Sequence, residues 1–510
     1  MNKYDRQIRI WGDYGQQCLE TSNVCIIGVT AANCEALKGL ILPGLGSFTI
    51  VDSKKSLEAY SLSNFFYHHN ENLTKSECVL ESLQNLNTSS LGCTAEYEVV
   101  ISDVNKYTLF IVADGELAED KFEELAEQLW NAEVPMLLVF SRNNVGAIIP
   151  LFQEMCVIDA HVDFDLKGLC LYKPFETLND MCKQTFTDNE DVKVIPWPLL
   201  VLHYSSANSD VCERLNSVCE SLINTDANEC RNFQEAIKYA KRSLENPLQH
   251  DKLACMFNYI ENKLININKA ANSQIAIRNR MFWIIFGGLK RFVADEAFRM
   301  PVNPQLPDMH SNTSLFTMLK TVYRDQAAKD LQRLIEICQS LLPDAEINLT
   351  LLKIISANCS STTVVRGRSY RQIKEIALKN EDANPPLCAI ISRHLFNARW
   401  NRNPVYTDNP SDHSFTLSEY KKLPAILKLD KIQRYQKIKG RDGDITKINN
   451  MHLNNVVDCI LDGSDNNLAP VTNWIGNAVA HEAIKIITGQ YIISPKILIF
   501  DGHLMKIETF

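Results

Sequence analysis

The first 150 residues alternate short apolar runs with stretches whose apolar residues recur at helical spacing. Residues 23–28 form an apolar run that ends in Gly28, and residues 48–52 form a second run that ends in Asp52. Residues 31–42, which lie between them, carry apolar residues three and four positions apart, as one face of a helix does. This order of strand, turn, helix and strand predicts a βαβ unit of the dinucleotide-binding type.

Further apolar runs predict strands over residues 95–101, 108–113, 135–140 and 146–152, and a helical pattern covers residues 117–131. Because strands alternate with helices, the pattern indicates an α/β fold with a mostly parallel, doubly wound, Rossmann-like sheet.

The pattern changes after about residue 150, where helical periodicity replaces the strand alternation. Amphipathic helices are predicted over residues 210–224, 280–297 and 317–342. We therefore predict an α/β domain that is split by a long, mostly helical insert. The predicted boundaries are 1–150 for the first part, 151–430 for the insert and 431–510 for the return to the α/β domain.

Composition narrows the class of protein. The 510 residues carry a formal net charge of −9, which argues against nucleic acid as the main partner. A hydrophobic share of 45% excludes an intrinsically disordered chain. We see neither an apolar run long enough for a membrane span nor a secretory signal.

The sixteen cysteines show no C-x-x-C spacing, which argues against a structural zinc site. The pattern favours reduced thiols used as small core residues. Counting does not exclude a single catalytic cysteine among them.

The turn after the first strand departs from a phosphate-binding loop. Where G-x-G-x-x-G would place three glycines, this chain has Gly28, Thr30 and Asn33. The loop needs small residues because backbone N–H groups must approach the phosphates closely. A Rossmann-type scaffold with a vestigial nucleotide site is favoured, and nucleotide binding at this loop stays the alternative.

Both ends of the chain resemble one family. Residues 4–12, 40–52 and 63–66, together with the closing segment 470–489, are similar to the adenylation domains of ubiquitin-like-modifier activating enzymes. This resemblance implies a ThiF/MoeB-like adenylation fold.

Segments of the insert narrow the resemblance to the regulatory subunits of heterodimeric neddylation activating enzymes. These segments are residues 232–237, 306–309, 322–330 and 364–369. The equivalent subunit of the sumoylation activating enzyme is an alternative, but it is shorter and would lack most of this insert.

Positions that bind ATP in active members of the family are changed here. Asp52 occupies the ribose position, but Lys54 replaces the second acid that should follow it. Tyr67 stands where the family has an arginine, and Glu77 stands where it has a lysine. Adenylyl transfer depends on cations that neutralise phosphate charge. The resemblance therefore implies that this chain binds no cofactor itself, and that ATP and Mg²⁺ bind in the partner subunit.

Arg6, in contrast, suggests that this chain takes part in ATP binding by its partner. The family's N-terminal Y-D-R-Q motif places an arginine, here Arg6, that reaches the ATP of the partner subunit in trans. An ordinary surface arginine is the alternative. We also predict a partner interface at Pro307, Asp308, Met309 and Tyr323, where the insert resembles the family.

The resemblance implies a regulatory subunit without catalytic residues of its own. Its partner would adenylate the modifier's C-terminal glycine and then hold the modifier as a cysteine thioester, and a conjugating enzyme would bind transiently. We expect no metal site, since the adjacent His68 and His69 lack a third ligand. The expected localisation is cytoplasmic and nuclear. A self-sufficient nucleotide-dependent Rossmann enzyme and a helical scaffold unrelated to enzymes are the alternatives from other classes.

Overall fold

The computed structural model divides the chain into two compact units. The sheet unit comprises Met1–Met155, Ala271–Ile277 and Val365–Phe510, and the helical unit comprises Cys156–Ala270 and Arg278–Val364. The structure describes residues 3–56, 64–161, 166–188, 191–205, 210–222, 230–249, 251–265, 272–296, 299–341, 347–379, 468–502 and 505–509.

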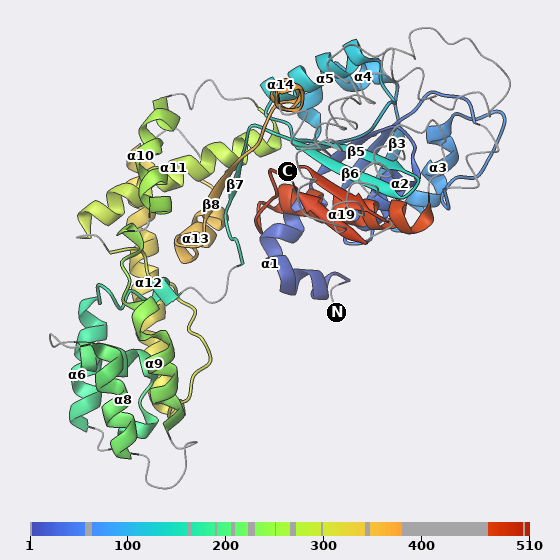
Figure 1. The fold of residues 1–510 in the computed structure, drawn as a ribbon. Coiled ribbons are helices and arrows are strands. Elements are labelled where there is room, and N and C mark those ends of the chain that lie inside the picture. The colour runs from blue at the N-terminus through green and yellow to red at the C-terminus, as the bar shows by residue number, and fades with distance from the viewer. Residues whose placement is uncertain are drawn as a thin grey trace, which may run out of the picture. The chain divides into compact units, whose positions relative to one another are not determined.

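The sheet unit is built on eight strands in the order β10-β9-β6-β5-β4-β1-β2-β3 (Figure 1). The strands are β1 (Asn23–Ile27), β2 (Ser47–Val51), β3 (Leu91–Thr94), β4 (Leu109–Ala113), β5 (Met136–Arg142), β6 (Val145–Leu151), β9 (Leu498–Asp501) and β10 (Lys506–Thr509). Strands β1 to β5 pair in parallel, whereas β6, β9 and β10 continue the sheet with antiparallel pairing. The α/β fold class predicted from the sequence is confirmed.

Helices cover both faces of this sheet. Figure 1 shows α4, α5 and α14 on one face and α1 and α19 on the other. The helices of this unit are α1 (Asp5–Glu20), α2 (Ala31–Ile41), α3 (Lys75–Gln84), α4 (Tyr97–Ile101), α5 (Glu119–Asn131), α14 (Tyr370–Lys379) and α19 (Ala469–Thr488). Helices α2 and α19 touch through small residues: a Cβ on Gly39 would lie 2.6 Å from the Cβ of Ala480, so only glycine permits this packing distance.

One predicted strand is wrong. Residues 97–101 form helix α4 rather than part of a strand over 95–101. Tyr97 and Val100 are buried three positions apart, while Val99 between them is 64% exposed. That spacing places both buried side chains on one helical face, whereas a strand would bury alternate residues.

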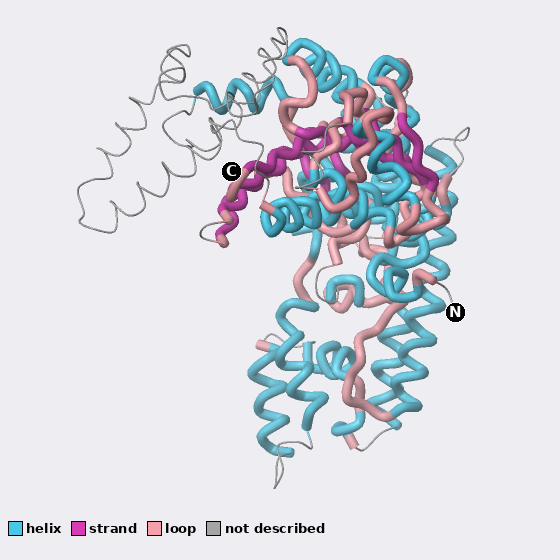
Figure 2. Tube along the Cα trace, turned by 90° about the vertical axis from the view of Figure 1, so that its right-hand side faces the viewer, coloured by secondary structure: helices cyan, strands magenta, loops and turns pink. Residues whose placement is uncertain are grey.

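The helical unit contains most of the insert, and Figure 2 draws it mainly as helices joined by loops. Its helices are α6 (Glu176–Asp188), α7 (Trp197–Ser205), α8 (Val211–Leu222), α9 (Arg231–Ser243), α10 (Asp251–Ile265), α11 (Gln274–Asp295, whose first residues belong to the sheet unit), α12 (Thr313–Leu341) and α13 (Leu349–Ala357). The strands β7 (Glu154–Val157) and β8 (Thr363–Arg366) form a separate two-stranded sheet. The helices predicted over 210–224, 280–297 and 317–342 correspond to α8, α11 and α12.

The chain returns to the sheet unit at Val365. Helix α14 packs on α5 through the rings of Tyr370 and Phe122, whose centroids are 4.8 Å apart. Lys374 adds ion pairs with Glu119 at 3.2 Å and Glu123 at 2.7 Å. Residues 365–379 therefore lie with the sheet unit, although the sequence placed them in the insert. The predicted boundary at 430–431 lies outside the described residues.

The described residues were also compared with what a membrane span and a metal site require. No described helix combines the length and the apolar character needed to cross a membrane. The described residues also contain no group of three or more His, Cys, Asp or Glu side chains arranged to hold a metal ion.

Candidate functional site

The loop after β1 keeps the backbone turn of a nucleotide-binding loop but is covered. Gly28 has a φ of +91°, a conformation that favours glycine. A Cβ at this position would lie only 2.2 Å from Cγ of Glu116, which follows β4. The side chain of Glu116 therefore lies directly against the glycine that a nucleotide phosphate would have to approach.

The two residues that replace glycines, Thr30 and Asn33, form hydrogen bonds within the loop. Thr30 is the N-cap of α2, and its Oγ1 accepts a hydrogen bond from the N–H of Asn33 at 3.2 Å. The buried side chain of Asn33 donates to the carbonyl oxygens of Gly28 at 3.0 Å and Ile27 at 3.4 Å. A backbone donor that a phosphate would use at this helix end is thus already occupied.

Asp52, the acid predicted at the ribose position, also has partners within the chain. Its carboxylate accepts from the backbone N–H of Val29 at 3.0 Å and of Lys54 at 3.1 Å. Only 6% of Asp52 is exposed. Burial and, after it, the nearby carboxylate of Glu116 raise the pKa of Asp52, against the smaller opposing effects of Lys75 and the Val29 N–H.

Two lysines supply the positive charge near this loop. Lys54 forms an ion pair with Glu116, and Lys75, the first residue of α3, is 4% exposed and acts on Asp52. The lysine charges are therefore offset by carboxylates of the same chain. Glu116 was not predicted as a site residue. Its position beside Asp114, together with the unexpected Lys54, is the sequence signal that could have indicated this pair.

The acid at position 77 has a local structural role. Thr74 and Glu77 form a capping box at the start of α3: the N–H of Thr74 donates to Glu77 at 2.8 Å, and the N–H of Glu77 donates to Thr74 at 3.4 Å. The hydrogen bonds from Thr74 lower the pKa of Glu77. The carboxylate thus stays ionised where the family has a cation.

Tyr67 is likewise directed into the protein. It is 3% exposed, and its hydroxyl donates to Oγ of Ser56 at 2.6 Å. Oγ of Ser56 also lies 2.7 Å from Nδ1 of His69. This position contributes no cation to a phosphate.

Arg6 lies in a different setting, near the start of α1. The helix start is anchored by the buried Tyr4, whose hydroxyl accepts from Asn87 at 3.0 Å, and by Trp11, whose Nε1 donates to Gln16 at 3.1 Å. Arg6 itself is exposed and has no hydrogen bond or ion pair within the described part of the chain. Arg9, one turn along, pairs with Asp5 at 2.9 Å.

The predicted partner interface needs one correction. Tyr323 is fully buried, and its hydroxyl donates to the carbonyl oxygen of Leu169 at 2.9 Å. Its side chain belongs to the core of the helical unit and offers no surface to a partner. Pro307 and Met309 are half-buried and Asp308 is exposed, so this loop does reach the surface.

The described cysteines are mostly buried. Burial raises the pKa of Cys34 and of Cys338 to about 12, and that of Cys182 to about 11. A thiol shifted in this direction is a poor nucleophile at neutral pH, because the thiolate is the reactive form. Cys388 and Cys459 lie outside the described residues.

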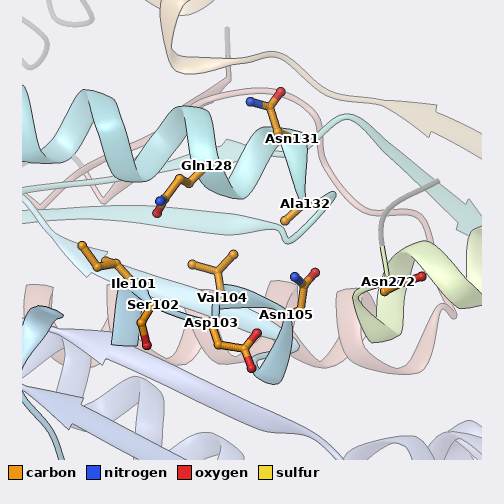
Figure 3. A pocket seen from close by; sticks show the side chains of 9 residues that line it. All are labelled: Ile101, Ser102, Asp103, Val104, Asn105, Gln128, Asn131, Ala132 and Asn272. Atoms are coloured by element: carbon orange, nitrogen blue, oxygen red, sulfur yellow. The ribbon is translucent and has the colours of Figure 1, made fainter. Parts of the chain in front are cut away.

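A hollow of about 500 Å³ lies in the sheet unit, among the residues that Figure 3 labels. Its lining comes from the segments before β4 and β5, from α5 and from Asn272 just before α11, whereas Gly28 follows the carboxyl end of the parallel strand β1. It is lined by Ile101, Ser102, Asp103, Val104, Asn105, Gln128, Asn131, Ala132 and Asn272. Because the two lie at opposite ends of parallel strands, the hollow is no part of the nucleotide-type site.

The parallel strands, the Gly28 turn and the acid after β2 define a Rossmann-like α/β unit whose nucleotide loop is filled by its own side chains. No protein-family model matches the chain. Full-length relatives nevertheless confirm the resemblance found in the sequence: the chain is similar to NEDD8-activating enzyme E1 regulatory subunits.

The relative from Gallus gallus is 28% identical, and the alignment covers 100% of this chain and 97% of the relative. The Drosophila melanogaster subunit is 29% identical, with 96% and 93% covered. The subunit AXL of Arabidopsis thaliana is 23% identical, with 98% and 97% covered. Among solved structures, E. coli MccB with MccA-N7isoASN is 16% identical, and the alignment covers 37% of this chain and 57% of that chain with a TM-score of 0.26.

Proposed function

We propose that this chain is the regulatory subunit of a heterodimeric NEDD8-activating enzyme. Its partner, the catalytic subunit, adenylates the C-terminal glycine of the modifier with ATP and Mg²⁺ and then forms a cysteine thioester with it. The similarity to regulatory subunits along the whole chain supports this assignment.

The filled loop at Gly28 is the observation that best supports a non-catalytic role for this chain. A triphosphate entering there would meet the carboxylates of Asp52 and Glu116. It would also have to displace the internal hydrogen bonds of Asn33. Since phosphate binding depends on free backbone donors and unpaired cations, these residues do not fit a nucleotide.

Arg6 is the residue through which this chain acts on the partner's chemistry. An arginine remains charged at neutral pH and binds phosphate oxygens with paired N–H donors. Arg6 is exposed on a helix start that Tyr4 and Trp11 hold in place. In the proposed heterodimer its guanidinium contacts the ATP in the partner subunit.

The helical unit forms one wall of the groove that receives the modifier, and the surface loop at Pro307, Asp308 and Met309 contacts the catalytic subunit. A conjugating enzyme binds the assembled complex transiently. The complex operates in the cytoplasm and the nucleus.

Reconstitution tests the proposal. A candidate catalytic subunit is mixed with modifier and ATP, with and without this chain, and modifier thioester is measured on gels without reductant. We expect thioester only when both subunits are present. Equal thioester formation without this chain would overturn the proposal.

The isolated chain provides a second test. A ligand that binds the native state raises the melting temperature. Because the loop at Gly28 is filled, we expect no shift with ATP or NAD. A clear concentration-dependent shift would favour the self-sufficient nucleotide enzyme instead.

A further inference from the structure

Helix α9 of the helical unit has a strongly two-sided character. Phe233, Ala236 and Ala240 are buried, so these positions form the face that packs on the unit's core. Arg231, Lys238, Lys241 and Arg242 are exposed. These four residues, called the α9 cationic stripe, cover three turns of the outer face.

The stripe is unusual in how little of its charge is neutralised. Lys238, Lys241 and Arg242 have no ion pair with any described residue. Helix α19 shows the common alternative, since its Lys485 pairs with Glu482 on the preceding turn. The whole chain carries a net charge of −9, so this stripe is a local reversal of sign.

The acids nearest to the stripe have other partners. The carboxylate of Glu235 contacts Nδ1 of His310 at 2.5 Å and accepts from the backbone N–H of His310 at 3.1 Å. Glu245 lies 3.8 Å from Lys167.

The contacts of Glu235 also fix a loop beside the stripe. Nη1 of Arg231 lies 3.3 Å from Nε2 of His310, so the imidazole is held between Arg231 and Glu235. His310 directly follows Pro307, Asp308 and Met309, the loop predicted to contact the partner. Helix α9 and this loop therefore present one continuous surface, with half-buried apolar side chains beside exposed cations.

A helix dipole gives a local reason for Lys241 and Arg242, which lie in the last turn of α9. It gives no reason for Lys238, which precedes that turn. Glu235 lies one turn before Lys238, where an acid can pair with a lysine, but its carboxylate contacts His310 instead.

We propose that the α9 cationic stripe and the loop at Pro307–Met309 together form a docking surface for an acidic surface of the catalytic partner subunit. This inference rests on the proposed function, because it names the partner's charge and the place where the partner docks. Exposed charge at the rim of an interface acts mainly through the rate of association and its dependence on salt.

The test compares binding of the full chain and its Lys238→Glu/Arg242→Glu variant to the catalytic subunit, with association rates measured at low and at physiological salt. We expect the association rate at low salt to fall about tenfold and the salt dependence to flatten. The matched control is Lys329→Glu/Lys353→Glu, which makes the same charge change at exposed, unpaired lysines of α12 and α13. The control should associate like the wild type.

The conservative variant Lys238→Arg/Arg242→Lys keeps the charges and should bind normally. An equal salt dependence for the wild type and the reversed variant would overturn the inference, as would an equal loss in the control. If the wild-type chain itself fails to bind the catalytic subunit, the proposed function fails, and this outcome is distinct from failure of the docking surface alone. Unchanged melting temperatures of all variants establish that each one folds.

Discussion

Two regions of the sheet unit carry charged residues of the kind that bind nucleotides. The two regions differ in whether those residues have partners within the chain. At the Gly28 loop, Asp52 binds two backbone N–H groups and Lys54 pairs with Glu116. At the start of α1, Arg6 is exposed and unpaired among the described residues, although Arg9 beside it is paired. Charged groups that already have partners within the chain are not free to bind a ligand, whereas an unpaired charge on an anchored helix is available to another molecule.

Reversing Arg6 should have the largest effect. In the reconstituted heterodimer, Arg6→Glu should lower ATP–pyrophosphate exchange by about 10²-fold, because it replaces a phosphate-binding cation by a repelling acid. Arg9→Glu makes the same charge change three residues away and should leave exchange close to the wild-type rate. If exchange is equal in both variants, Arg6 has no role in trans.

Removing the amide of Asn33 should have an intermediate effect, on stability rather than on activity. Asn33→Ala loses the hydrogen bond to Gly28, but it also removes a buried Oδ1 that has no partner among the described residues. We expect a net loss of about 1 kcal/mol in the free energy of unfolding, measured with urea.

The exposed Asn477→Ala variant on α19 provides the control for Asn33 and should change stability by less than about 0.5 kcal/mol. Asn33→Ala should still show no ATP-dependent rise in melting temperature, because Asp52 and Glu116 remain. A clear rise would mean that the amide alone had closed the site, and the contrast between the two regions would break down.

Substitution of Asp52 should have the smallest effect, which is a change in how the unfolding free energy depends on pH. Because burial raises its pKa, the folded state binds this proton more tightly than the unfolded chain does. The stabilisation is present below the unfolded pKa of about 3.9 and is lost as pH rises through the folded pKa. Asp52→Asn cannot ionise, so as pH rises above about 4 the wild type should lose more unfolding free energy than the variant. If the unfolding free energies of the wild type and the variant, measured with urea, change with pH in parallel, the pKa of Asp52 is not raised.

The sequence predicted the Gly28 turn and the positions of Thr30, Asn33 and Asp52, because apolar runs and glycine place the first strand and its loop. It also predicted most strands of the sheet. It failed at residues 97–101, where a short segment rich in valine resembles a strand in composition while its burial follows a helical period.

The failures within the site have a different cause. Tyr323 was assigned to an interface because it lies in a family-like segment, but similarity of sequence does not separate a core position from a surface position. The pairing of Lys54 with Glu116 joins residues that are far apart in the chain. Such a contact depends on how β2 and β4 are arranged around β1, which no local pattern contains.

The position of β9 in the sheet has a consequence for how the molecule is made. Strand β9 pairs with β6, with Ala147 opposite Ile499, so about two thirds of the chain lies between two neighbouring strands. The entropy of closing such a long loop and the high contact order both slow folding. On a ribosome, the helical unit can fold as it emerges, but the edge of β6 and the surface of α2 around Gly39 stay uncovered until the last residues are synthesised. A chaperone that shields these surfaces during translation would therefore act on the N-terminal end of the protein, even though the delay comes from its C-terminal end.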